Sequence, residues 1–348
     1  MVAALEVLAP GLHSTVQDFG RFGFQDLGVP VAGALDPVGL RLANALVGNR
    51  PGEAGLELSY LGPTVKVAAA SARIAVAGPV RLALTPADGE ARMLDPDRAH
   101  TLHQGDVLAI GAVAGAAVAY LAVAGGFDLA PVLGSLATYV RAGLGPLGGK
   151  PLAAGMVLPL RLDAAPTGPD LALAEPFEYG LGPIRVVPGP QADAFTDEAM
   201  ATFLAADYTV SKEADRMGLR LDGPVLAHRG KADIVSDGLV SGCIQVPGNG
   251  APIILLADHQ TAGGYAKIAT VISADLPRLG RAVPGTKLRF KAVSVAEAEQ
   301  ARRALEREVK RCIEGLRDAG IGAGIDLAAL YGNDLVSGMI DAISGEGR

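Results

Sequence analysis

The sequence predicts a mainly β protein with more than one domain. A chain of 348 residues is longer than one hydrophobic core usually serves, so two domains of about 150 residues are expected. Its 46 glycines and 23 prolines, against 19% charged residues, indicate many turns between short strands. Residues 56–90 show this rhythm, because apolar stretches alternate there with turns at Gly62-Pro63, Gly78-Pro79 and Asp88-Gly89. Such alternation is typical of a β-barrel or sandwich.

Composition and charge restrict the kind of partner. A net charge of −7 leaves no basic patch for nucleic acid, and the lack of tryptophan with only 4% aromatic residues weighs against a base-stacking surface. The two cysteines, Cys243 and Cys312, form neither a disulfide framework nor a metal-ligand spacing. We therefore expect no nucleic-acid partner, no metal site and a reducing, cytoplasmic location.

Residues 107–127 contain no charge and are long enough to suggest a membrane span. The stretch begins at a Gly105-Asp106 turn, and Ala114-Gly115-Ala116 divides it into two pieces of strand length. We therefore predict a buried β-hairpin and no membrane helix. The N-terminus has no basic region before an apolar core, so no signal peptide is expected.

The remaining elements follow in chain order. Apolar and polar residues alternate at 5–8, which predicts a short strand. After a linker rich in alanine, proline and glycine, residues 184–187 predict a similar strand at the start of the second half. Helical spacing appears at 40–49 and 193–204. Near the C-terminus, Ser294 and Glu297 form a capping-box signal before a long amphipathic helix, and a second amphipathic segment is expected at 326–343.

Residues 236–273 hold the pattern that most suggests chemistry. The apolar run 253–257 reads as a strand buried on both faces, and it ends in Asp258-His259-Gln260-Thr261 followed by Gly263-Gly264-Tyr265. Polar groups at the end of a rigid strand, with glycines that admit close backbone, can hold a reactive constellation. The alternative is a plain turn, in which these side chains only satisfy the loop backbone.

Two further segments carry charge in turn-rich surroundings. Residues 14–36 include Arg21 and Asp36, and residues 209–224 include Ser211 and Arg216. Solvated surface ion pairs, which contribute little stability, would also explain these charges.

Several strings resemble one known family. IQVP (244–247), ADHQTAGGY (257–265), DLPRLGRAVPG (275–285) and TVQD-x-GR (15–21) are similar to the signature of the family of 5-oxoprolinase C subunits. That family is also called the KipA or allophanate hydrolase subunit 2 family, and it resembles half of the biotin-dependent carboxyltransferase domain of urea carboxylase.

The resemblance implies two cyclophilin-like β-barrel domains with a few short helices and a C-terminal helical extension. We place them at 1–160 and 183–292, joined by a linker at 161–182, with the extension at 293–348. It also implies a complex with two partners, a KipI-like B-type subunit and a LamB/YcsF-like A-type subunit. The complex would open the lactam of 5-oxoproline to L-glutamate, using ATP through the assembly.

The family pattern assigns roles to residues of this chain. Asp258, Gln260 and His259 form the expected catalytic group, and for carboxyl transfer Asp258 is expected to be the base or the acceptor for the substrate nitrogen. The expected substrate-binding residues are Thr261, Gly263, Gly264, Tyr265, Gln245, Arg216, Ser211, Asp36 and Arg21.

Two alternatives to the lactamase remain open. One is the carboxyltransferase component of a biotin-dependent urea or related carboxylase, with biotin carried by another protein. The other is a non-enzymatic antagonist that binds a KipI-like partner. The true substrate, the stoichiometry and the subunit that holds ATP are not specified by these residues.

Overall fold

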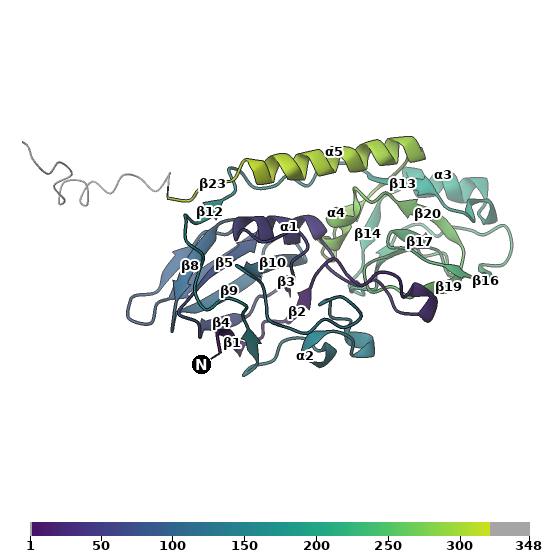
Figure 1. Cartoon of the computed structure of the whole chain (residues 1–348). Coiled ribbons are helices and arrows are strands. Elements are labelled where there is room, and N and C mark those ends of the chain that lie inside the picture. The colour runs from purple at the N-terminus through teal and green to yellow at the C-terminus, as the bar shows by residue number, and fades with distance from the viewer. Residues whose placement is uncertain (1, 321–348) are drawn as a thin grey trace, which may run out of the picture.

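The computed structural model describes residues 2–320 of the chain. Two barrel-like β units lie side by side, and the helix α5 (Val295–Glu314) runs along the top of both (Figure 1). The prediction of a mainly β protein with short helices and a long C-terminal helix is confirmed.

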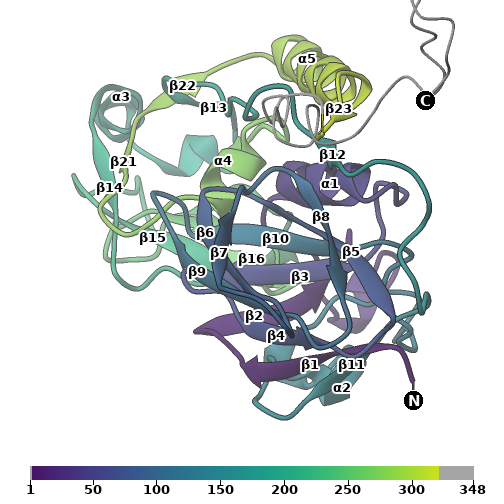
Figure 2. The same cartoon turned by 90° about the vertical axis from the view of Figure 1, so that its left-hand side faces the viewer.

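The first unit consists of two antiparallel sheets, whose strands can be followed in Figure 2. The six-stranded sheet contains, in spatial order, β11 (Val157–Pro159), β1 (Ala4–Ala9), β4 (Thr64–Val67), β9 (Val107–Val113), β6 (Val80–Thr85) and β7 (Arg92–Leu94). The five-stranded sheet contains β2 (His13–Gln17), β3 (Gly55–Ser59), β10 (Val118–Val123), β5 (Ser71–Ala77) and β8 (Ala99–His103).

The prediction of a hairpin within 107–127 is wrong, although both of its strands exist. β9 pairs with β4 and β6, whereas β10 pairs with β3 and β5 in the other sheet. β10 is buried along its whole length, because alternate residues face two different cores: Ala119, Leu121 and Val123 face the barrel interior, and Val118, Tyr120 and Ala122 face a helix. The uncharged stretch is thus a strand covered on both faces. Within residues 2–320, no helix is long and apolar enough to cross a bilayer.

The helix that covers β10 is α1 (Pro37–Leu46). It begins three residues before the predicted position, because the Asp36 carboxylate accepts hydrogen bonds from the amides of Val38 and Gly39, and Pro37 takes the first helical position. Its buried residues include Leu40, Ala43 and Leu46, as the spacing predicted.

The second unit contains an eight-stranded sheet and a two-stranded ribbon. The sheet is mixed, since β13 pairs with β22 in parallel, and its order is β21 (Lys287–Leu288), β14 (Tyr208–Val210), β15 (Gly218–Asp222), β18 (Ile253–Leu255), β17 (Cys243–Gln245), β20 (Lys267–Val271), β13 (Ile184–Pro188) and β22 (Phe290–Ala292). The ribbon pairs β16 (Asp233–Gly238) with β19 (Ala262–Tyr265).

The remaining helices are short. The predicted helix at 193–204 is split, because the chain is extended at Phe195 and Thr196, and Thr196 then caps α3 (Asp197–Ala205). The others are η1 (Gln25–Leu27), η2 (Val140–Ala142), α2 (Pro146–Gly149), η3 (Ala192–Ala194) and α4 (Leu276–Gly280).

The C-terminal helix α5 contacts both units. Its capping box forms as predicted, with the Ser294 side chain accepting from the Glu297 amide and the Glu297 carboxylate accepting from the Ser294 amide. The helix packs on α1 and β13, and Val309 is its one fully buried residue. Beyond it, β23 (Arg317–Asp318) pairs with β12 (Leu171–Ala172) of the segment between the units. The predicted segment at 326–343 lies outside the described residues.

We expect Val309→Ala to loosen α5 by lowering the free energy of unfolding by about 2 kcal/mol, since it removes buried methyl groups and leaves a cavity. Urea denaturation would measure this loss. Val295→Ala is the matched control on the same helix, because Val295 is 61% exposed and should change stability by less than about 0.5 kcal/mol. Equal effects of the two variants would contradict the packing of α5 on α1.

Candidate functional site

A cleft of about 320 Å³ lies between the two units. The first unit supplies one wall, with Leu12, His13, Tyr60, Val118, Val140 and Arg141, and the second supplies Asp215, Arg216, Met217, Leu256, Asp258 and Leu279. Most of this lining is apolar. Asp258 follows β18, so the predicted arrangement of a polar group at the end of a buried strand is present.

Arg216 is the centre of the charged groups at this cleft. Its Nε and Nη2 each donate to a different oxygen of Asp258, at 2.9 Å in both cases. Nη2 also donates to the Gly33 carbonyl at 2.7 Å, and Nη1 donates to Glu57 of the first unit. A guanidinium has five N–H donors. Four of them have partners within residues 2–320, which leaves one N–H of Arg216 for a ligand oxygen.

Glu57 connects this ion pair to the helix cap of the first unit. Its carboxylate accepts from the Tyr120 hydroxyl at 2.6 Å and from the Leu35 amide at 2.8 Å. The Tyr120 oxygen in turn accepts from the Asp36 amide at 2.8 Å. We call Asp36, Glu57, Tyr120, Arg216 and Asp258 the interunit network. It connects Asp36 with Arg216 and Asp258 through two residues, Glu57 and Tyr120, that the sequence analysis did not single out.

Burial sets the protonation behaviour of the interunit network. Burial alone would lower the pKa of Arg216, but the charges of Glu57 and Asp258 outweigh it and raise that pKa above its usual value. The pKa of Asp36 is raised by burial, against the opposing charge of Arg281 and the hydroxyl of Tyr179. The pKa of Tyr120 is raised well above its ordinary value by burial and by the charges of Glu57 and Asp36. Arg216 therefore remains a cation, and Tyr120 remains a hydrogen-bond donor.

Arg21 is 1% exposed and does not line the cleft. Its Nη2 donates to the Ala137 carbonyl, and its Nε and Nη1 have no partner within the described part of the chain. Burial lowers its pKa, against the charges of Asp18 and Asp258. The predicted residue Arg21 is thus close enough to Asp258 to feel its charge but makes no ion pair with it.

Three other predicted residues form a second group on the second unit. Gln260 donates weakly to Gln245, with 3.5 Å between Nε2 and Oε1. A Cβ at position 263 would lie 2.8 Å from the Gln245 amide nitrogen, so a larger residue there would displace the Gln245 side chain. None of the three lines the cleft, so the structure does not join this group to Arg216 and Asp258.

The other predicted residues are more scattered. The Ser211 hydroxyl accepts from the Glu213 amide inside its own turn. Thr261, Gly264 and Tyr265 belong to the β16–β19 ribbon and its approach, and Tyr265 is 41% exposed. His259 is buried, its Nδ1 contacts the Gln260 carbonyl, and burial lowers its pKa.

Sequence reasoning missed Glu57, Tyr120 and Tyr60. Glu57 is fully buried between Leu56 and Leu58 of β3, and a lone carboxylate in an apolar strand was the available signal. Tyr60 lines the cleft with a left-handed backbone (φ 59°), which is uncommon for a residue with a side chain. Arg141 and Asp215 approach each other across the cleft mouth, with 3.7 Å between their charged atoms.

This fold and cleft have known relatives. The family described as "Carboxyltransferase domain, subdomain A and B" matches residues 27–292, and the chain belongs to that family. It is 36% identical to the C subunit of 5-oxoprolinase from Escherichia coli (strain K12) over 87% of this chain and 96% of that one. The Haemophilus influenzae protein of the same name is 33% identical over 86% of this chain and 94% of that one. The family resemblance read from the sequence is confirmed.

The fold also matches solved structures. The crystal structure of the K. lactis urea amidolyase aligns with a TM-score of 0.79 at 29% identity, and the alignment covers 89% of this chain and 20% of that one. This chain therefore matches one segment of the much longer urea amidolyase.

We expect Glu57→Gln to lower the free energy of unfolding by about 3 kcal/mol, because it leaves a buried guanidinium with one carboxylate in place of two. Chemical denaturation at neutral pH would measure it. Glu213→Gln is the matched control: Glu213 pairs with Arg220 at the surface and should cost less than about 1 kcal/mol. If Glu57→Gln is no less stable than Glu213→Gln, the interunit network does not stabilise the fold.

The burial of His259 makes stability depend on pH. Its folded pKa lies below the ordinary value of 6.5, so the unfolded chain binds more protons between these two values. Stability should therefore fall as pH drops below about 6.5. We expect His259→Gln to show a shallower loss than the wild type in urea denaturation between about pH 7.5 and 5.

The variant His103→Gln, at an exposed position, is the control for any general effect of replacing a histidine by glutamine. His100, whose pKa burial also lowers, contributes to the slope of every variant alike. Identical slopes for wild type and His259→Gln would show that His259 is protonated equally in both states.

Proposed function

We propose that this chain is the C subunit of an ATP-dependent 5-oxoprolinase, which hydrolyses the lactam of 5-oxoproline to L-glutamate together with A-type and B-type (KipI-like) subunits. The observation that carries the proposal is similarity. The chain is 36% identical to the 5-oxoprolinase subunit from Escherichia coli over 96% of that subunit, and 29% identical to the matching part of the urea amidolyase. The higher identity favours the 5-oxoprolinase subunit.

Opening a lactam places negative charge on oxygen atoms, and the site has to stabilise that charge. In such a reaction the lactam oxygen would take a phosphoryl group from ATP, and water would then add to the carbonyl carbon. The C–N bond would break and the nitrogen would take up a proton, which leaves an acyl phosphate. A second water would hydrolyse this acyl phosphate to glutamate and phosphate. The remaining N–H of Arg216 suits an oxygen that gains charge in these steps, and the apolar walls of the cleft suit the ring methylenes. We infer that ATP use requires the assembled complex.

The role proposed for Asp258 changes with this geometry. Both of its oxygens accept from Arg216, so it is suited to hold the guanidinium in place. To act as a base it would have to give up one of these hydrogen bonds. Gln260 and His259 lie outside the cleft lining and have no proposed contact with the lactam.

Carboxyl transfer from biotin is the second candidate, and one observation favours it. The crystal structure of the K. lactis urea carboxylase aligns with this chain at a TM-score of 0.79. The ureido ring of biotin is a cyclic amide like 5-oxoproline, and the same apolar walls and free Arg216 N–H fit it. Another protein would carry the biotin, and the carboxyl group would pass to a urea-like nitrogen.

Glutamate release from 5-oxoproline and ATP, with this chain and its A-type and B-type partners, tests the proposal. We expect release only when all three are present. Asp258→Asn should lower kcat by about 100-fold or more, because it loosens the Arg216 donor. Glu213→Gln, an exposed residue away from the cleft lining, should retain wild-type activity.

A stable complex that releases no glutamate would contradict the lactamase proposal. Carboxylation of a urea-like acceptor from carboxybiotin would then be measured with the same variants. Tight pairing with the B-type partner and turnover in neither assay would favour an antagonist.

A further inference from the structure

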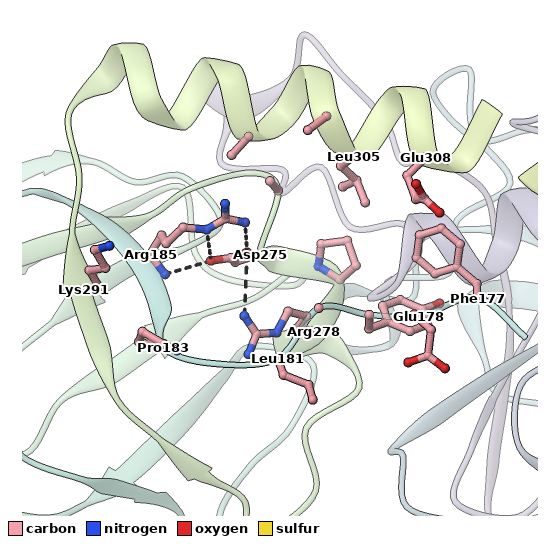
Figure 3. Close-up of a pocket in the computed structure, with 16 residues that line it drawn as sticks. Phe177, Glu178, Leu181, Pro183, Arg185, Asp275, Arg278, Lys291, Leu305 and Glu308 are labelled. Carbon is pink, nitrogen blue, oxygen red and sulfur yellow. Dashed lines mark hydrogen bonds and ion pairs between the residues drawn. The ribbon is translucent and has the colours of Figure 1, made fainter. Parts of the chain in front are cut away.

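A larger pocket, of about 510 Å³, lies beneath α5 and away from the cleft. Its walls come from residues 177–183, from α4 and the residues before it, from β13 and β22, and from α5 (Figure 3). It shares no lining residue with the cleft. The function proposed above uses none of it.

One end of this pocket carries an excess of positive charge. Asp275 is 1% exposed, and Arg185 donates to both of its oxygens at 3.0 and 2.6 Å. The Arg278 Nη1 lies 3.9 Å from the same carboxylate, and its Nη2 donates to the Gly182 carbonyl at 2.6 Å. Lys291 lies beside Arg185 at this end (Figure 3). This end of the pocket thus contains one carboxylate and three cationic side chains.

Within the part of the chain that the structure describes, both guanidinium groups have N–H donors without a protein acceptor. Arg185 uses two of its five N–H groups on Asp275, and Arg278 uses one on the Gly182 carbonyl. Burial lowers the pKa of Arg278, and the charge of Arg185 lowers it further, against the charge of Asp275. An added anion would relieve this repulsion and take up the free donors.

The other end of the pocket is acidic and aromatic. Glu178, Glu308 and Phe177 lie there, at the opposite end from Lys291 (Figure 3). Glu308 is also paired with Arg311, but that pair is on the surface, with Arg311 77% exposed, and leaves the second carboxylate oxygen available. Between the two ends, the lining is apolar: Pro277, Ala301, Ala304 and Leu305.

The pocket has a definite length along α5. It extends from Ala301 to Glu308, which corresponds to about 10 Å at 1.5 Å per helical residue. An extended peptide covers about 3.3 Å per residue, so about three residues match this length.

We propose that this pocket is a second binding site, and that it takes a free peptide of about three residues, with its carboxylate at Arg185, Arg278 and Lys291 and its ammonium at Glu308 and Glu178. A ligand with both charges gains at both ends. A plain anion would meet the acidic end and a plain cation the basic end, so each would bind less tightly. The apolar lining between the two ends suits small aliphatic side chains.

Titration calorimetry of the full chain with trialanine tests the site, with N-acetyl-trialanine and trialanine amide as the singly charged comparisons. We expect trialanine to bind at least tenfold more tightly than either capped form. This measurement needs no turnover and no partner protein, so its failure is independent of the proposed function. Equal binding of trialanine and N-acetyl-trialanine, or binding of none of the three, would overturn the proposal.

Variants locate the two charged ends. Lys291→Gln should weaken trialanine binding several-fold, whereas Lys287→Gln, an exposed lysine outside the pocket, should not. Glu308→Gln should remove most of the preference for trialanine over its acetylated form. Glu299→Gln is its control on the same helix, because Glu299 pairs with Arg303 and does not line the pocket. A preference that survives Glu308→Gln and Glu178→Gln would place the ligand elsewhere.

Discussion

The buried guanidinium of Arg216 joins the two units at the base of the cleft. It extends from the second unit and is bonded to Asp258 of its own unit and to Glu57 and the Gly33 carbonyl of the other. Removing such a cation from water costs several kcal/mol unless it is fully paired. The pairing exists only when both units contribute their oxygens, so the base of the cleft and the contact between units form together.

The same requirement extends into the first unit. Glu57 is fully buried, and Tyr120, the Leu35 amide and Arg216 all donate to its carboxylate. Tyr120 in turn holds the Asp36 amide, and Asp36 caps α1. A helix that covers the barrel is therefore fixed by the same hydrogen bonds that orient the cleft. A substitution at Asp36 should therefore alter the surroundings of Arg216, and a substitution at Arg216 should alter those of Asp36.

Local patterns predicted what depends on neighbours in sequence. The strand before Asp258, the helix of residues 40–46 and the capping box at Ser294 were all recognisable, because period, caps and breakers act over a few residues. The Arg216–Glu57 pair joins residues 159 positions apart, and no local rule selects such a partner. The prediction that β9 and β10 form a hairpin was wrong for the same reason. The turn between the two strands is compatible with pairing in one sheet or with placement in two different sheets.

The position of α5 limits how the cleft can open. This helix of 20 residues packs on α1 of the first unit and on β13 of the second, and so bridges the two units. A hinge motion that moved the units apart would have to bend α5 or expose the buried side chain of Val309. Small molecules should therefore enter through rearrangement of the cleft rim, where Arg141 and Asp215 meet, while the two units keep a constant spacing.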